Sequence, residues 1–185
     1  MSKKVLVLLG SPHAGGSSEK LAKAFEKGAQ ERGCDVREVR LAPLCLNGCL
    51  GCRRCWTTGN PCIQRDDMDE IYPLLEKADA IIFASPLFFY SWTAQIKPVI
   101  DRMFAFLGKD SPVRLSGKQT ALLTVCGDAE EGAFAGLSAS YRILADYMKW
   151  ENIGEVYASG IHTPADMDAH GAPKLSEAEA LGGRL

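Results

Sequence analysis

The side chains best suited to metal or redox chemistry are four closely spaced cysteines. They follow the pattern Cys-x2-Cys-x2-Cys-x6-Cys and are Cys49, Cys52, Cys55 and Cys62. Four thiolates at such spacing can wrap a cubane [4Fe–4S] cluster, each iron taking one sulfur. Three interpretations remain open: a cluster, a loop of free thiols without metal, and zinc or a disulfide. Zinc sites usually pair two Cys-x2-Cys units across a longer gap.

A second segment, residues 10–18, is rich in glycine and hydroxyl residues and suits an anion. The apolar residues 5–9 before it predict a strand buried on both faces, and the periodicity of residues 19–31 predicts an amphipathic helix. In a strand–loop–helix unit, free backbone N–H groups and the positive end of the helix dipole meet at the loop and favour phosphate. The alternative is a turn in which Ser17 or Ser18 caps the helix without a ligand.

The glycine pattern narrows the kind of phosphate. Gly10-x4-Gly15 approaches a Walker A loop, but Gly16 stands where that loop needs lysine, which argues against NTP hydrolysis. The dinucleotide fingerprint fails because Ser11 and Pro12 fall where its glycines should be. The loop then offers the hydroxyls of Ser11, Ser17 and Ser18 and its backbone amides, which suit a monophosphate bound without a metal.

Length and composition favour one domain, residues 1–185, that does not bind nucleic acid or membranes. The chain is 46% apolar with a net charge of −2 and has no basic tract. No apolar run approaches the roughly 20 residues that span a bilayer, and no signal peptide is recognisable, so we expect a cytoplasmic protein. Seven cysteines in such a chain are better interpreted as thiols or ligands than as disulfides. Outside the spaced motif, Cys34, Cys45 and Cys126 are interpreted as packing residues.

Apolar runs and helical periodicities alternate along the chain and predict an α/β fold. Strands are expected at residues 5–9, 36–41, 80–84, 121–125 and 155–159, and helices at 19–31, around Pro73, and at 96–107, 134–148 and 174–180. This alternation predicts a three-layer α/β/α, doubly wound, parallel five-stranded sheet of the flavodoxin-like type. Residues 42–65 form a cysteine-rich insertion loop, and residues 160–185 form a C-terminal tail.

In such a sheet a ligand lies beyond the carboxyl ends of the strands, where three predicted loops converge. These are residues 10–18, 85–92 and 126–132. The second loop supplies flat apolar surface from Phe88, Phe89, Tyr90 and Trp92. A ring system carrying a phosphate tail matches these two loops, and FMN is the best match. The alternative is that residues 88–90 are core at a strand end; Trp92 is interpreted as a packing residue.

Three motifs in order resemble the NADPH-dependent FMN reductase family of flavodoxin-like flavoproteins. They are Gly10-Ser11-Pro12-x-x-x-Gly16-Ser17-Ser18, Ser85-Pro86-Leu87-Phe88-Phe89 and Gln95-x-Lys97-x-x-x-Asp101-Arg102. The resemblance covers about residues 4–160 and implies FMN contacts. The implied phosphate contacts are Ser11, Ser17 and Ser18, with Gly16 and His13 in the same loop. The implied ring contacts are Pro86, Leu87, Phe88, Phe89 and Tyr90, with Cys126, Gly127 and Asp128 at the far edge. Lys97, Asp101 and Arg102 are interpreted as bracing a helix.

The resemblance implies an enzyme that passes electrons from NAD(P)H through FMN to a small-molecule acceptor such as a quinone or free flavin. The flavin carries the chemistry, so no catalytic side chain is assigned. The cysteine spacing resembles the iron–sulfur flavoproteins, which implies the alternative of an electron carrier between a ferredoxin-type donor and FMN. A third hypothesis is a redox-responsive binding protein. By resemblance, the expected assembly is a homodimer or homotetramer.

Overall fold

Five parallel strands form one sheet in the order β2-β1-β3-β4-β5. The computed structural model describes residues 2–58, 61–109, 111 and 113–185. The strands are β1 (Lys4–Leu9), β2 (Asp35–Arg40), β3 (Ala80–Pro86), β4 (Gln119–Val125) and β5 (Glu151–Ala158). This order is that of the flavodoxin-like fold, so the predicted fold class is confirmed.

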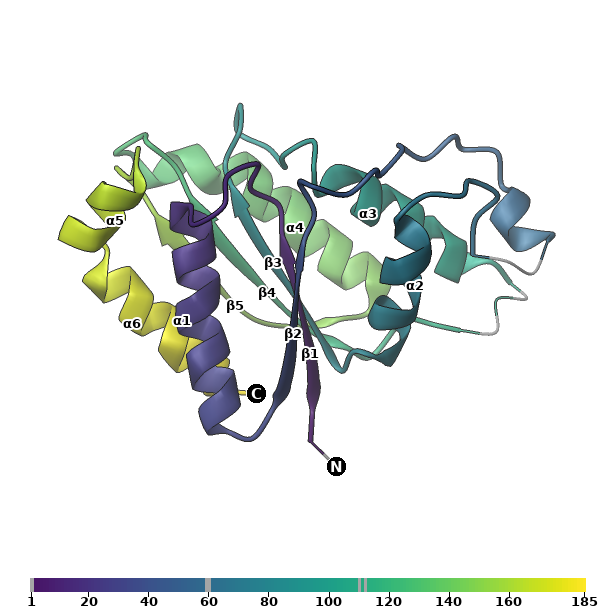
Figure 1. The fold of residues 1–185 in the computed structure, drawn as a ribbon, viewed down its shortest axis with the longest axis horizontal. Coiled ribbons are helices and arrows are strands. Elements are labelled where there is room, and N and C mark those ends of the chain that lie inside the picture. The colour runs from purple at the N-terminus through teal and green to yellow at the C-terminus, as the bar shows by residue number, and fades with distance from the viewer. Residues whose placement is uncertain (1, 59–60, 110, 112) are drawn as a thin grey trace.

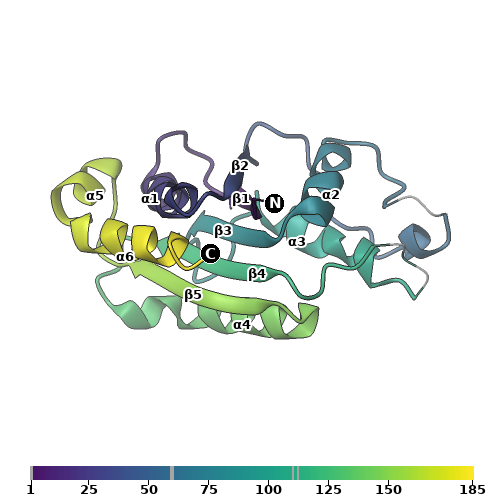
Figure 2. The same ribbon diagram turned by 90° about the horizontal axis from the view of Figure 1, so that it is seen from below.

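Helices cover both faces of the sheet and give three layers (Figures 1 and 2). One face carries α1 (Ser17–Glu31), α5 (Pro164–His170) and α6 (Ala172–Gly182), and the other carries α2 (Met68–Lys77), α3 (Lys97–Arg102) and α4 (Ala135–Met148). Three short 3₁₀ helices are η1 (Arg54–Trp56), η2 (Met103–Leu107) and η3 (Glu131–Phe134). Alternate strand residues point to opposite faces, so Val5 and Val7 belong to one core and Leu6 and Leu8 to the other.

Three elements differ from the sequence prediction. The helix expected over residues 96–107 is α-helical only as far as Arg102 and continues as a 3₁₀ helix. β5 begins at Glu151, four residues before the predicted start. Its first residues are polar and exposed, so the apolar pattern did not reveal them, and the pairing with β4 is irregular at Thr120/Ala121. The C-terminal tail contains two helices instead of one, and a capping box of Thr163 and Asp166 starts the first. No helix of the described ranges is long and apolar enough to cross a bilayer.

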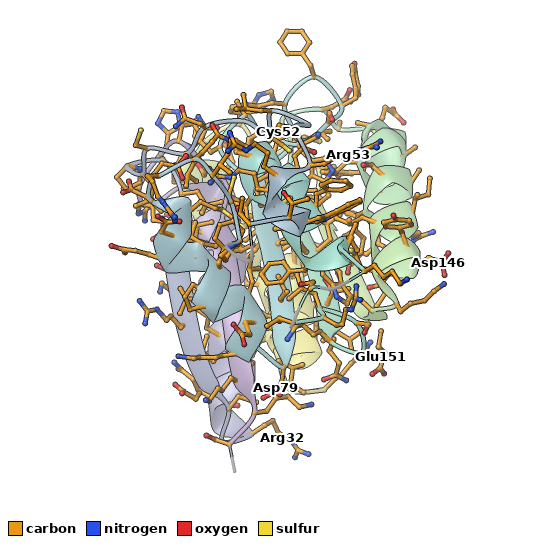
Figure 3. The ribbon with its side chains drawn as sticks, turned by 90° about the vertical axis from the view of Figure 1, so that its right-hand side faces the viewer. Arg32, Cys52, Arg53, Asp79, Asp146 and Glu151 are labelled. Carbon is orange, nitrogen blue, oxygen red and sulfur yellow. The ribbon has the colours of Figure 1, made fainter. Side chains whose placement is uncertain are left out.

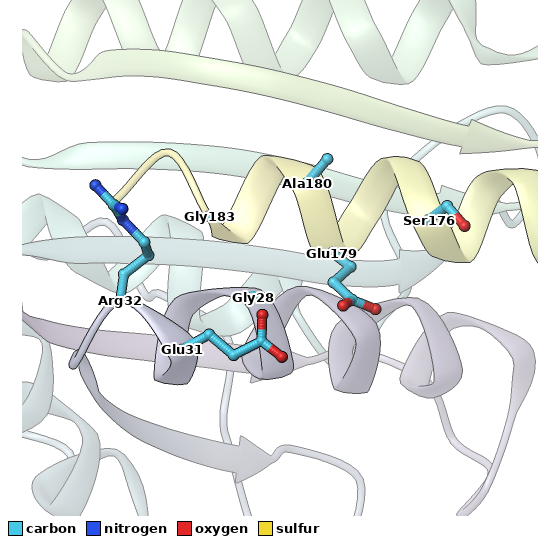
Figure 4. A pocket seen from close by; sticks show the side chains of 7 residues that line it. All are labelled: Gly28, Glu31, Arg32, Ser176, Glu179, Ala180 and Gly183. Atoms are coloured by element: carbon cyan, nitrogen blue, oxygen red, sulfur yellow. The ribbon is translucent and has the colours of Figure 1, made fainter.

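The C-terminal helix α6 packs directly on α1, and the backbones of the two helices are in contact. A β-carbon on Gly28 would stand 2.0 Å from the carbonyl oxygen of Glu179, and one on Gly182 would stand 2.0 Å from that of Phe25. An ion pair of 2.7 Å between Lys27 and Glu179 crosses the same contact. Figure 4 shows a shallow groove beside this contact, lined by Gly28, Glu31, Arg32, Ser176, Glu179, Ala180 and Gly183. The groove shares no residue with the predicted ligand loops.

Replacing Gly28 or Gly182 by alanine should destabilise the fold, because the new methyl group meets a backbone carbonyl and the helices must move apart. Overpacking of this kind costs about 1–3 kcal/mol, which lowers the melting temperature by roughly 2–12 °C in a chain of this size. Thermal denaturation followed by circular dichroism measures the change. Gly132→Ala is the matched control, since its β-carbon meets no described atom within 4 Å. Equal melting temperatures for Gly28→Ala and Gly132→Ala would contradict the prediction.

Candidate functional site

The three predicted ligand loops begin at one edge of the sheet, joined by backbone hydrogen bonds that extend the strand pairing. Gly10 N donates to the carbonyl oxygen of Ala84 at 2.8 Å, and Leu87 N donates to that of Val125 at 2.8 Å. In Figure 1 the loops lie together above the carboxyl ends of the strands. The structure therefore brings these loops together as the sequence predicted. The chain adds β2 on one side of β1 and β3 on the other, so the strand order reverses between β1 and β3. Folds of this type bind ligands at this topological switch point.

The loop of residues 10–18 places three buried hydroxyl-bearing residues, Ser11, Ser17 and Ser18, at the N-terminus of α1. The helix is preceded by Gly16, and no side chain of the described residues caps it. The alternative in which Ser17 or Ser18 serves as the cap is therefore wrong. A β-carbon on Gly16 would stand 3.3 Å from Ser11 Oγ and 3.4 Å from the carbonyl oxygen of His13. The loop is thus a narrow cradle of hydroxyls and backbone amides.

Arg40, at the end of β2, is a cation that the sequence analysis missed. Its Nη2 pairs with Glu19 at 2.6 Å, and its Nη1 donates to the carbonyl oxygen of His13 at 3.3 Å. Glu19 also accepts a hydrogen bond of 2.7 Å from Gly15 N. Burial raises the pKa of Glu19, but the hydrogen bonds from Arg40 and Gly15 outweigh it and leave that pKa below its ordinary value. The available signal was the position of Arg40 at the carboxyl end of a predicted strand.

The aromatic loop contains a two-residue turn in a strained backbone conformation. Phe88 and Ser91 exchange backbone hydrogen bonds of 3.2 and 3.0 Å, and Phe89 and Tyr90 between them have φ angles of 45° and 61°. Two positive φ angles mark a type I′ turn, which favours Asn-Gly because a β-carbon is strained there. Phe89 is 99% exposed, so the alternative that these aromatics are core is wrong. Trp92 is buried, as predicted.

The third loop, after β4, is held by the start of the C-terminal tail. Gly160 N donates to the carbonyl oxygen of Asp128 at 2.7 Å. The imidazole of His162 covers Gly127, since a β-carbon there would stand 2.3 Å from its Nδ1. Cys126 is buried, as predicted for a packing residue, and burial raises the pKa of its thiol. His162 had no assigned role in the sequence, because it lies in a segment without periodicity.

The cysteine-rich loop runs from β2 to α2, outside the helices that cover the sheet. Figure 3 shows Cys52 and Arg53 towards the end of the molecule at which the strands finish, whereas Asp79 and Glu151, beside the starts of β3 and β5, lie at the opposite end. All seven cysteines are free thiols. Cys45 is exposed, so its interpretation as a packing residue is wrong.

The four spaced cysteines share features of metal ligands without forming a finished site. The backbone N–H of Gly51, two residues downstream, donates to the sulfur of Cys49 at 3.4 Å. Burial raises the pKa of the Cys55 thiol, and the other three thiols of the motif raise it further, so all four lie within electrostatic range. Over the ranges that the structure describes, no three Cys, His, Asp or Glu side chains are gathered to hold a metal ion.

A buried ion pair fastens the cysteine loop to α3. Arg102, the last residue of α3, pairs with Asp66 at 2.6 Å, and the two side chains are 1% and 2% exposed. Arg102 also donates to the carbonyl oxygen of Asn47 and, through Nε, to the hydroxyl of Tyr72, each at 3.3 Å. Lys97 pairs with its helix neighbour Asp101, as expected for helix bracing. Arg102 differs from that expectation, because its partners belong to the loop and to α2.

Cys62 lies against the Arg102 cluster, by which we mean Arg102, Asp66 and Tyr72. Burial raises the pKa of the Cys62 thiol, but the N–H of Gln64, the charge of Arg102 and the hydroxyl of Tyr72 outweigh it. The pKa of Cys62 is therefore below its ordinary value, whereas that of Cys55 is above. The two half-buried thiols of the motif thus differ because only Cys62 faces a fixed cation.

The sheet order defines a flavodoxin-like protein, with a serine-rich loop and an aromatic turn at the carboxyl edge of the sheet. Residues 3–162 match the sequence profile of NADPH-dependent FMN reductases. An iron–sulfur flavoprotein of Archaeoglobus fulgidus is 32% identical over 188 residues, which cover 98% of this chain and 78% of that protein. The chain belongs to the NADPH-dependent FMN reductase family, as its three motifs predicted.

Two further comparisons agree with this family. The iron–sulfur flavoprotein of Methanosarcina thermophila is 33% identical over 129 residues, covering 70% of this chain and 66% of that protein. The solved structure of NAD(P)H:quinone oxidoreductase from Methanothermobacter marburgensis matches with a TM-score of 0.78 and 20% identity, over 100% of this chain and 97% of that one. At this identity the structural match shows the fold. Family membership makes the chain an FMN-dependent oxidoreductase.

Replacing Phe89 and Tyr90 together by asparagine and glycine should stabilise the fold, because these residues tolerate the positive φ angles of the turn. Backbone strain of this kind costs about 1–3 kcal/mol per residue. A gain of about 2 kcal/mol would raise the melting temperature by roughly 4–8 °C. Phe89→Ala is the matched control, since it removes the exposed ring but keeps a β-carbon at positive φ. The prediction is wrong if the double variant melts no higher than this control.

Proposed function

We propose that the three loops bind FMN and that the chain passes electrons from NAD(P)H through it to a small-molecule acceptor such as a quinone or free flavin. Bound FMN supplies a hydride acceptor at N5 and releases electrons to the next acceptor. The observation that carries the proposal is the uncapped N-terminus of α1, with its buried serines, beside the exposed aromatic turn. A phosphate and a flat apolar ring suit these two features together.

The chain's own groups would hold the phosphate without a metal. The hydroxyls of Ser11, Ser17 and Ser18 and the first amides of α1 supply hydrogen-bond donors, and the helix dipole favours an anion there. Gly16 leaves the cradle open, since a β-carbon would narrow it. Arg40 is paired with Glu19, so it adds little net charge, and His13, exposed beside the cradle, is the remaining proposed contact.

The ring would lie between the second and third loops. Pro86 and Leu87, joined to β4 by the hydrogen bond of Leu87 N, lead into the turn of Phe88, Phe89 and Tyr90, which forms the proposed wall. The opposite edge is proposed to be Cys126, Gly127 and Asp128, with His162 over Gly127. These side chains orient the ring and exclude water from it. We assign no catalytic acid or base among them.

We further propose that Cys49, Cys52, Cys55 and Cys62 bind a [4Fe–4S] cluster. Four free thiols fit the donor set in number and chemistry, and the amide N–H donor to Cys49 fits a ligand sulfur. Binding would draw the thiols together from the positions that the structure gives them. The names of the two iron–sulfur flavoproteins above favour this assignment and the second candidate function, an electron carrier between a ferredoxin-type donor and FMN. A homodimer or homotetramer is the proposed assembly.

Ser17→Asp should weaken FMN binding by roughly 10- to 100-fold, because a carboxylate would oppose the phosphate and a hydrogen bond to a charged group would be lost. Riboflavin, which has no phosphate, should bind the variant and the wild type equally. Titration of the apoprotein by flavin fluorescence quenching measures both affinities. Ser116→Asp, an exposed position in the turn before β4 at the opposite edge of the sheet, is the charge-matched control. An equal loss of affinity for both flavins would contradict a phosphate site at residues 10–18.

Anaerobic purification separates the two functions. The FMN reductase predicts a flavin spectrum that bleaches on addition of NADPH and recovers with a quinone. If the protein is an electron carrier, we expect about four iron atoms and four acid-labile sulfides per chain, with negligible NADPH oxidation. A protein that takes up no FMN would overturn the main proposal.

A further inference from the structure

The outward face of α4 is apolar and exposed. Figure 2 shows α4 as the outer layer on its side of the sheet, next to β5. Most of the large hydrophobic side chains that the described residues leave exposed lie on this face or in the aromatic turn. Ile143 and Tyr147 of α4 are 70% and 66% exposed, and the turn contributes residues 88–90. The helix and the turn adjoin, because a β-carbon on Gly136 would stand 3.1 Å from the carbonyl oxygen of Tyr90. A contiguous patch of this kind marks an interaction surface.

The outward row of α4 is small at its start and large at its end. Its members are exposed and follow at intervals of four, three and four residues, so they share one face of the helix: Gly136, Ser140, Ile143 and Tyr147. A second copy of α4 that runs antiparallel across this face would lay Ile143 and Tyr147 towards the small residues at the other end. Small residues let two helices approach closely. The row therefore complements itself across a two-fold axis.

The charges beside this row have the same symmetry. Arg142 and Asp146 are four residues apart and lie on one flank of α4, since 3.6 residues complete a turn. A two-fold axis perpendicular to two antiparallel helices brings equal flanks together, so Arg142 of each copy would face Asp146 of the other. Asp146 is exposed on the side of α4 that faces away from the sheet (Figure 3). The Arg142 side chain is 65% exposed while its Nε pairs with Glu155 at 2.6 Å, so the guanidinium can serve a second acceptor.

We propose that the outward face of α4 is the contact between two copies of this chain, packed as antiparallel helices across a two-fold axis near Ile143. The inference rests on the homo-oligomeric assembly proposed above and assigns a surface to it. Ile143 and Tyr147 fill the centre of the contact. The pairs between Arg142 and Asp146 lie at its rim, where charges set orientation more than affinity. The aromatic turn borders the same contact at the start of α4.

Ile143→Glu in the full chain tests the centre of the contact. The substitution places two carboxylates beside the axis without partners, so the dissociation constant of the dimer should rise about 100-fold or more. Sedimentation equilibrium measures this constant. Leu50→Glu is the matched control, because Leu50 is 66% exposed but lies on the cysteine loop, and its dissociation constant should equal that of the wild type. Circular dichroism shows whether each variant folds, which we expect because both side chains are exposed.

A charge reversal tests the antiparallel arrangement. Asp146→Arg would set two arginines against each other at each rim, so the dissociation constant should rise about tenfold. Adding Arg142→Gln removes the repulsion and should recover most of the lost affinity. If the second substitution weakens the Asp146→Arg dimer further, the antiparallel arrangement is wrong. This pair of variants also decides the matter if Ile143→Glu does not fold.

The outcomes separate this inference from the proposed function. A wild-type protein that is monomeric at every concentration tested would overturn the inference and the proposed homo-oligomer together. An oligomer that Ile143→Glu leaves intact would overturn the inference alone, since its interface would then lie elsewhere. Neither result bears on the proposed FMN site, which the flavin titration of Ser17→Asp tests separately.

Discussion

In a parallel sheet the carboxyl ends of all strands fall on one edge, and here the strand pairing continues one residue into each loop. Gly10 pairs with Ala84, Leu87 with Val125, and Cys126 with Ala158, through backbone hydrogen bonds of 2.8, 2.8 and 3.0 Å. These bonds fix where each loop leaves the sheet. The proposed phosphate cradle and the aromatic turn depend on them, because neither loop has periodic structure of its own.

The Arg102–Asp66 pair is a different kind of support, because it is fully buried. Taking two charges out of water costs several kcal/mol per ion, and a well-packed apolar pair is often as stable. The pair therefore contributes position more than stability. It fixes Asp66 at the end of the cysteine loop, and Asp66 also accepts hydrogen bonds from Asn47, near the loop's start. In this way a loop of free thiols without periodicity gains a defined attachment to α3.

The sequence was most informative where structure is local. Apolar runs predicted β1, β3 and β4, and small residues after β1 predicted the cradle, because burial on both faces and a tight turn leave direct compositional marks. It was least informative for contacts between distant residues, such as Arg40 with Glu19 or Arg102 with Asp66. It also failed where residue preference opposes the fold: Phe89 and Tyr90 occupy turn positions that favour asparagine and glycine.

The two sites share one mechanical support, the segment of residues 93–102. At its start, Thr93 Oγ1 donates to the carbonyl oxygen of Gly10 at 2.7 Å, and a β-carbon on Gly10 would stand 3.0 Å from the Ile96 Cβ. Gly10, where the proposed phosphate cradle begins, therefore packs directly on this segment. At its end, Arg102 holds the cysteine loop through Asp66. Because close-packed interiors transmit strain, a displacement of this segment would shift both the loop of residues 10–18 and the cysteine loop. The loop of residues 10–18 and the cysteine loop thus both contact the one segment of residues 93–102, although they lie far apart in the sequence.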